Sequence, residues 1–300
     1  MKRGWITWNQ SELPRAAFDA RVHEARRCLA GQDLPALAVY TDIWRSNRVR
    51  HFSNFMPYWN RALLVIPRED KPLLLCGLSP RVYPWIKSVT ILEDLLPSPN
   101  LAQRLLQLGA ERGWSRIGAL DFTQFQFDLY TSLAAGPIPI VDVSLPLAPD
   151  EWEISMYRRA AQMAREGIAE ELPGAVGRTD HEFTGRLERK FRRAGAEDLI
   201  ILLTNGKTPP APARGETLEP AFSVSLALEY RGHWIKLVRN RVGHASGLPP
   251  DAYTETLSGP YPYELGAGSL FAARWESEHD GRRLFYGDTY RQTPAGAELL

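Results

Sequence analysis

One stretch restricts the possible folds more than any other, residues 222–240, which read FSVSLALEYRGHWIKLVRN. Its first half alternates valine and leucine with small or polar residues, a period of two that is typical of a β-strand with one buried face. Residues 230–232 (Tyr-Arg-Gly) supply a turn signal, and a second apolar, β-branched run follows them. The pattern predicts a β-hairpin that directs side chains from both strands toward one site.

The composition is that of a globular protein with a full core, because 44% of the 300 residues are hydrophobic and 24% are charged. A formal net charge of +1 gives no general electrostatic reason to expect binding to nucleic acid or to an anionic membrane. No apolar run is long enough for a membrane span or a signal peptide, so we expect a cytoplasmic location. Cys28 and Cys76 are too few for a disulfide framework, and we expect both to be buried apolar residues.

The first half of the chain alternates predicted helices and strands, which indicates an α/β domain with a mixed sheet. A helix is expected over residues 11–30, with Ser11 as a candidate cap, and another over residues 101–113. Strands are expected at residues 34–40, 62–66, 72–76, 89–92 and 116–121.

A proline-rich segment at residues 137–150 divides the chain. A long amphipathic helix is expected directly after it. Thr179 and Glu182 have the spacing of a capping box, which predicts the start of a second helix that runs to about Arg193. A strand at residues 199–203 then precedes the hairpin. We therefore expect two domains, residues 1–146 and 147–300, in a protein of the α/β (α+β) class.

A loop at residues 40–59 interleaves arginines with aromatic side chains. Guanidinium groups and aromatic rings together can hold a carboxylate or stack on a ring, so this loop is a candidate binding segment. The alternative is that its aromatic residues pack in the core and its arginines are solvated.

Taken in order, these stretches resemble the creatinase, prolidase and methionine aminopeptidase family, whose fold is called pita-bread. The hairpin matches the family pattern at Gly232 and Arg239. The other matches are residues 51–55, 63–67, 72–75, 153, 156, 158, 160–164, 177, 179, 182, 187–188, 195–196, 268, 288–289, 293 and 296–299. The resemblance implies an N-terminal creatinase-like domain and a pita-bread domain, shortened because only about thirty residues separate Arg239 from Gly268.

Enzymes of that family bind a pair of divalent metals through two aspartates of the hairpin, a histidine and two glutamates. The resemblance places Ser225 and Lys236 at the aspartate positions, and Arg274 and Gly287 at the glutamate positions. His244 is either the family's histidine or an ordinary turn residue. None of the four other positions carries a carboxylate, and an ammonium group repels a divalent cation. We therefore expect no metal, no other cofactor and no confident catalytic residue.

Two classes of function follow from the resemblance. In the first, the chain is a non-catalytic subunit, in a homodimer or in a heterodimer with a catalytic pita-bread homologue. Because N-terminal domains of the family complete the neighbouring subunit's pocket, Arg45, Arg50, His51 and Tyr58 would then reach the partner's substrate.

In the second, the chain acts by itself without metal. It would be a creatinase-like hydrolase of C–N bonds or a binder of an anionic small molecule, with Lys236, Arg239 and Arg274 as the ligand-binding group. The hydrolase alternative lacks the histidine base that creatinase-like chemistry requires. We therefore favour a protein that is not itself an enzyme.

Overall fold

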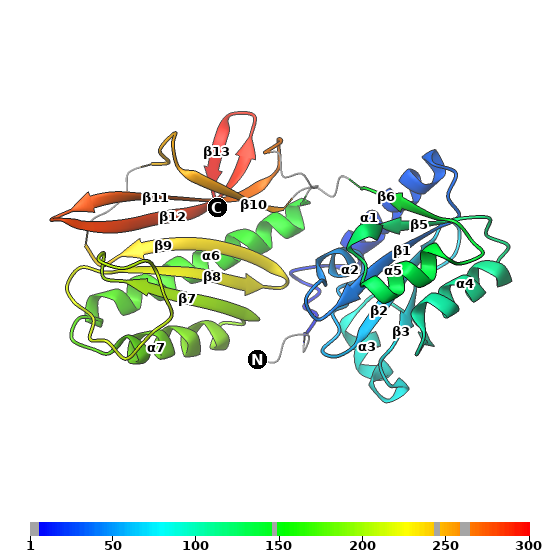
Figure 1. Ribbon diagram of the computed structural model, residues 1–300, viewed down its shortest axis with the longest axis horizontal. Helices are drawn as coiled ribbons and strands as arrows, with labels where there is room; N and C mark the ends of the chain where they lie inside the picture. The colour runs from blue at the N-terminus through cyan, green and yellow to red at the C-terminus, as the bar shows by residue number, and fades with distance from the viewer. Residues whose placement is uncertain (1–5, 146–148, 243–246, 259–264) are drawn as a thin grey trace. The chain divides into compact units, whose positions relative to one another are not determined.

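The computed structural model describes residues 6–145, 149–242, 247–258 and 265–300. The chain divides into two compact units, an N-terminal unit of residues 2–145 and a C-terminal unit of residues 146–300 (Figure 1). None of the described helices is both long enough and apolar enough to cross a membrane.

The N-terminal unit is built around a six-stranded mixed sheet with the strand order β4-β3-β2-β1-β5-β6. Strands β1, β5 and β6 are parallel to one another, and β2 runs antiparallel to both of its neighbours. Its elements are α1 (Arg15–Gly31), β1 (Ala36–Asp42), α2 (Asn47–Ser53), β2 (Arg61–Pro67), β3 (Leu73–Cys76), α3 (Tyr83–Val89), β4 (Asp94–Pro97), α4 (Leu101–Glu111), β5 (Ile117–Leu120), α5 (Phe127–Ala134) and β6 (Ile140–Val143), with 3₁₀ turns at Pro80–Val82 and Phe122–Gln124.

The central strands of this sheet are buried on both faces, as expected for a sheet between two helical layers. Alternate residues of β1, β2, β3 and β5 pack with α4 and α5 in one continuous core. Helix α1 buries an apolar stripe that includes Phe18, Val22 and Leu29. The predicted alternation of helices and buried strands therefore corresponds to a layered core.

Two local expectations for this unit are wrong. Residues 89–92 do not form a strand, because α3 ends at Val89 and the strand follows later as β4. The Thr90 hydroxyl donates to the Ile86 carbonyl and closes the helix end, and a short apolar run alone does not distinguish such a connection from a strand. Ser11 is not a cap, because α1 begins after Pro14 and the Ser11 hydroxyl donates to the Asn9 side chain instead.

The C-terminal unit contains a seven-stranded sheet with the order β10-β11-β12-β9-β8-β7, in which β13 also pairs with β12. All of its strand pairs are antiparallel. Its elements are α6 (Glu151–Glu171), α7 (Asp180–Arg193), β7 (Asp198–Thr204), β8 (Ser223–Tyr230), β9 (His233–Asn240), β10 (Tyr253–Ser258), β11 (Leu270–His279), β12 (Arg282–Thr293) and β13 (Gly296–Leu299), with a 3₁₀ turn at Leu172–Gly174.

The predicted hairpin is confirmed as β8 and β9. Arg231 and Gly232 connect the strands with φ values of 52° and 86°, the left-handed conformation that two-residue hairpin turns use. The capping box of Thr179 and Glu182 is also confirmed at the start of α7.

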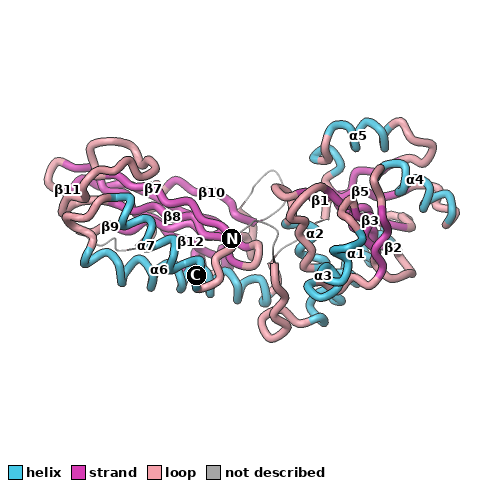
Figure 2. Tube along the Cα trace, turned by 90° about the horizontal axis from the view of Figure 1, so that it is seen from below, coloured by secondary structure: helices cyan, strands magenta, loops and turns pink. Residues whose placement is uncertain are grey.

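Helices α6 and α7 lie on one side of the C-terminal sheet (Figure 2). Leu226, Leu228, Ile235 and Leu237 alternate with less buried residues and supply the apolar surface between the hairpin and these helices. No helix among the described residues of this unit covers the opposite face, which we call the open face. The side chains between the apolar positions therefore define a separate surface.

Candidate functional site

A single row of residues crosses the open face from β8 to β10. Ser225 is opposite Val238, Val238 is opposite Gly287, Gly287 is opposite Arg274, and Arg274 is opposite Tyr253. Residues directly opposite each other in antiparallel strands project from the same face. Three of the four positions that the sequence assigned to lost metal ligands therefore lie in one line.

Lys236 joins this group, since it lies two residues before Val238 on β9 and so projects from the same face. Its backbone N–H donates to Thr289 Oγ1 at 2.9 Å, and that hydroxyl donates back to the Lys236 carbonyl at 2.8 Å. The ammonium group lies 2.5 Å from Glu255 Oε1 on β10. Both side chains of this ion pair are more than one-third exposed, so the pair contributes at most about 1 kcal/mol.

Arg274 is exposed, and its guanidinium lies 4.8 Å from the centre of the Tyr253 ring. At that distance the ring attracts the cation without neutralising it. No carboxylate forms an ion pair with Arg274 in the part of the chain that the structure describes. The face therefore carries one cation balanced by Glu255 and a second, Arg274, held over an aromatic ring.

Gly287 occupies a place where no side chain fits. A Cβ atom there would lie 2.7 Å from the Ala273 carbonyl oxygen, and 3.2 Å from both Arg274 Cβ and Val238 Cγ2. The first contact is with the backbone of β11, which a rotamer change cannot relieve. The backbone therefore opposes a glutamate at this position, in addition to the sequence lacking one.

These residues do not fit a divalent metal pair. A hydroxyl, an ammonium, a guanidinium and a bare backbone replace the carboxylate oxygens that such ions require. Among the described residues, no group of three or more His, Cys, Asp or Glu side chains is arranged to hold a metal ion. His244 lies outside the described residues.

The structure does not bring Arg239 to the expected ligand-binding group. Arg239 is an odd number of residues from Lys236 on the same strand, so it projects from the face that α6 covers. Its Nη2 lies 2.5 Å from Asp288 Oδ2, and its Nη1 donates to the Gly287 carbonyl at 2.9 Å. Asp288 also lies 3.4 Å from Arg165 of α6. Only Lys236 and Arg274 of the expected three share the open face, and Arg239 has a structural partner.

The expected partner-binding segment also needs correction. Part of it forms helix α2, and Arg50 is only 5% exposed, with Nη1 3.7 Å from Met56 Sδ. A side chain enclosed in this way is not available to a second subunit. His51 and Tyr58 are half-buried and pack edge-on against Phe52 and Trp85. Arg45 is the exposed member of the four, and it donates to the Gln124 carbonyl.

Three aromatic side chains are strongly exposed among the described residues of the N-terminal unit: Trp44 and Trp59 lie in the candidate binding segment, and Phe127 was missed from the sequence. Trp44, Trp59 and Phe127 are 72%, 70% and 80% exposed, and we call these three residues the aromatic edge. Hydrogen bonds join the segments that carry them: Arg45 donates to the Gln124 carbonyl, and Arg61 donates to the side chains of Gln126 and Asp128. The signal for the tryptophans was present in the sequence, but composition alone does not distinguish an exposed tryptophan from a core one.

No protein-family model and no curated protein sequence matches the chain. Solved structures do match it over nearly its whole length. The Xaa-Pro dipeptidase from Bacillus anthracis is 15% identical, with a TM-score of 0.68, and the match covers 93% of this chain and 96% of that one. The X-Pro aminopeptidase from Thermotoga maritima is 13% identical, with a TM-score of 0.73 and coverage of 93% and 96%.

A third match is the prolidase from Pyrococcus horikoshii, which is 13% identical, with a TM-score of 0.69 and coverage of 93% and 97%. Identities this low establish the fold and leave activity to be argued from the residues present. The chain has the pita-bread fold of the prolidases, Xaa-Pro dipeptidases and aminopeptidases P, in a shortened form of 300 residues.

Proposed function

We propose that this chain is a non-catalytic, metal-independent subunit that works beside a catalytically intact pita-bread hydrolase. The observation that carries the proposal is the replacement of the ligand set on one continuous face. Ser225, Lys236, Arg274 and Gly287 lie together there, and none offers a carboxylate. A metal-activated water needs at least three good protein ligands around the ion, and the open face does not supply them.

The aromatic edge supports a role in association. Exposed large apolar side chains are a common property of interaction sites. Trp44 and Trp59 lie on loops and Phe127 begins α5, and hydrogen bonds of Arg45 and Arg61 join these segments, so the three residues would lose little backbone freedom on binding. We propose that this edge, with Arg45, takes the place of Arg50 and His51 in contacting the catalytic partner near its substrate pocket.

The test is co-expression with the catalytic pita-bread homologue encoded closest to this chain. We expect a complex on size-exclusion chromatography and a rise in the partner's kcat/KM when this chain is present. The variants Trp59→Ala and Phe127→Ala should each weaken both effects by tenfold or more. Trp152→Ala, which removes an exposed tryptophan from the C-terminal unit, should leave both unchanged.

Two results would contradict the proposal. One is hydrolysis of Xaa-Pro peptides by this chain alone with added manganese, cobalt or zinc. The other is a partner that has full activity by itself and forms no complex.

A second candidate function is the binding of an anionic small molecule on the open face. It is favoured by Arg274, which has no ion-pair partner in the described part of the chain and projects from the same face as Lys236. Calorimetric titration with a dicarboxylate or a phosphate ester tests it, with Arg274→Gln as the variant. Arg283→Gln is the control, since Arg283 is already paired with Glu276 on the same strands. Equal binding by all three proteins would exclude this site.

A further inference from the structure

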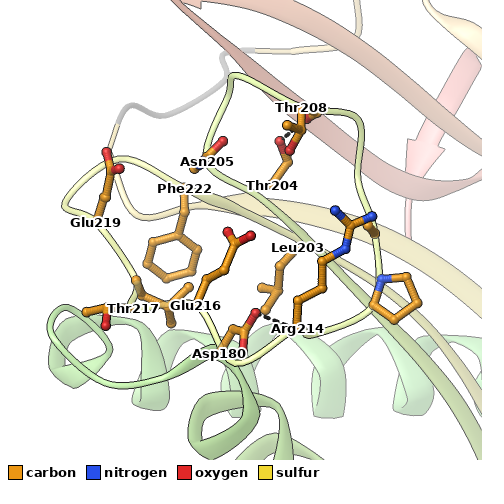
Figure 3. Close-up of a pocket in the computed structure, with 13 residues that line it drawn as sticks. Asp180, Leu203, Thr204, Asn205, Thr208, Arg214, Glu216, Thr217, Glu219 and Phe222 are labelled. Carbon is orange, nitrogen blue, oxygen red and sulfur yellow. Dashed lines mark hydrogen bonds between the residues drawn. The ribbon is translucent and has the colours of Figure 1, made fainter.

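A small cavity lies at the edge of the C-terminal sheet, apart from the row between Ser225 and Tyr253. It is lined by the end of β7, the first turn of α7 and the loop of residues 205–222, and it opens to solvent (Figure 3). Its volume is about 50 Å³. A single water requires about 10–15 Å³ on the same measure, so the cavity accommodates several atoms of a ligand.

The loop that forms the cavity is fixed at both ends. Asp180 is buried, and its two carboxylate oxygens accept from the backbone N–H groups of Arg214 and Gly215, each at 2.8 Å. Leu203 and Ala211 exchange two backbone hydrogen bonds, and Leu218 donates to the Arg178 carbonyl. The backbone of the loop is therefore already ordered where these bonds are made, which lowers the conformational cost of binding a ligand.

The charged side chains around the cavity differ in whether another group balances their charge. Glu219 lies 2.7 Å from Arg282 and 3.6 Å from Lys207, so its charge is balanced. The charge of Asp180 is taken up by backbone N–H groups. Arg214 and Glu216 differ from both, because neither forms an ion pair with the other or with another side chain within the described residues.

Arg214 and Glu216 are close in the chain and line the same cavity. Figure 3 shows Glu216 extending from the segment beside Asp180 into the space between Phe222 and Leu203, whereas the Arg214 side chain rises on the other side of Leu203. The site thus presents one cation and one anion to the same small volume. Both side chains are exposed, so a ligand with a single charge would pair with one of them and leave the other to solvent, whereas a zwitterion would pair with both.

The remaining walls are apolar at the base and polar at the rim. Leu203, Leu218 and Phe222 are buried and form the apolar part. Thr204 donates to the Thr208 carbonyl, which orients the rim next to Asn205. Such walls suit a ligand with a short aliphatic portion between two charged groups.

We propose that this cavity binds a small zwitterion, namely an α-amino acid of the size of glycine or alanine. Arg214 holds the ligand carboxylate through its planar guanidinium, and Glu216 accepts from the ligand ammonium group. The volume admits the charged backbone of an amino acid and little more, which selects against large side chains. The inference is independent of the proposed function, because it uses no residue of the open face or of the aromatic edge.

The test is titration of the full chain with glycine and L-alanine. Binding is measured by isothermal calorimetry and by changes in amide chemical shifts. We expect dissociation constants on the order of 1 mM, as is usual for ligands of so few atoms. Arg214→Gln and Glu216→Gln should each weaken binding by tenfold or more. Arg193→Gln removes an exposed arginine at the end of α7 and should leave binding unchanged.

Acetate and methylammonium provide the ligand controls, since each carries only one of the two charges. We expect both to bind at least tenfold more weakly than glycine. Acetate binding as tight as glycine binding, with no loss in Glu216→Gln, would replace the proposal with a simple anion site. No saturable shift for glycine or L-alanine up to 50-fold above the expected constant would overturn it. Unchanged thermal unfolding of the variants separates these outcomes from loss of the fold.

Discussion

Arg239 and Asp288 form an ion pair on the face of the C-terminal sheet that α6 covers. The pair joins β9 to β12, two strands whose ladder contains a single registered residue pair. Asp288 is 10% exposed and also lies near Arg165, so one carboxylate links two strands and a helix. It thereby holds together the two halves of the sheet that carry the open face.

We expect Asp288→Asn to lower the free energy of unfolding by about 2–4 kcal/mol, because it leaves two partly buried guanidinium groups without their counter-charge. Chemical denaturation measures the change. Glu276→Gln removes a carboxylate from an exposed pair on the same sheet, and it should cost less than about 1 kcal/mol. Equal effects of the two variants would show that Asp288 has no special role.

Gly287→Ala should lower the free energy of unfolding by about 1–3 kcal/mol, because the new Cβ meets the Ala273 carbonyl of the neighbouring strand. Gly185→Ala is the matched comparison. It lies inside α7 with nothing within 4 Å of the added atom, so it should stabilise by about 0.5–1 kcal/mol through helix propensity. Thermal unfolding of both variants checks the difference in sign.

Asp180→Asn should destabilise the protein at neutral pH and have little effect in acid. Burial raises the pKa of Asp180, but the backbone N–H groups of Arg214, Gly215 and Glu216 outweigh it and leave the pKa below its ordinary value. A lowered folded-state pKa stabilises the fold above the unfolded pKa of about 3.9, and that contribution disappears as the pH falls through the folded value.

The expected loss for Asp180→Asn at pH 7 is about 1–3 kcal/mol. Denaturant titrations at several pH values should show the gap between this variant and the parent chain closing below about pH 4. A gap that stays constant with pH would mean that the hydrogen bonds do not depend on the charge of Asp180.

Arg50→Ala should act on stability, because the residue is enclosed in the N-terminal unit. We expect a loss of about 1–3 kcal/mol, as for other buried charged donors that are removed. Arg45→Ala, in the exposed part of the same segment, should change stability by less than about 0.5 kcal/mol. A larger loss of stability in Arg45→Ala than in Arg50→Ala would contradict the burial of Arg50.

Tag-free protein should contain far less than one equivalent of manganese, cobalt, zinc or iron by elemental analysis. A unit charge 4 Å from a divalent ion costs roughly 8 kcal/mol at an effective dielectric constant near 20, and the open face carries Lys236 and Arg274. Glu255 balances the charge of Lys236, but the charge of Arg274 would still repel the ion. Stoichiometric metal that is lost in Glu255→Gln would contradict this expectation.

The sequence predicted the hairpin and the helices around it because their patterns are local and regular. The alternation of β8, the turn at Gly232 and the capping box at Thr179 each depend on neighbouring residues alone. The prediction of a strand at residues 89–92 was wrong for the opposite reason. Its apolar residues are buried by packing between distant elements, which a short run does not reveal.

The candidate site was predicted in part. Positions that a family resemblance aligns, such as Ser225 and Gly287, do lie in one row. The sequence could have predicted that Arg239 does not share a face with Lys236, since residues an odd number apart on a strand project from opposite faces. The burial of Arg50 and the cavity beside Asp180 could not be predicted from the sequence, because both depend on how a loop folds against residues far away in the chain.

The tight contact at Gly287 has a consequence for how such a protein changes over time. A chain that once had a glutamate there could not regain it by one substitution, because the neighbouring strand now occupies the space of the first side-chain atom. Reversion would require β11 to move before the new side chain became tolerable, and the intermediates would be less stable than either end point. The order of substitutions then matters more than their number, and descendants of this chain are expected to diversify at Ser225, Lys236 and Arg274 while keeping the glycine.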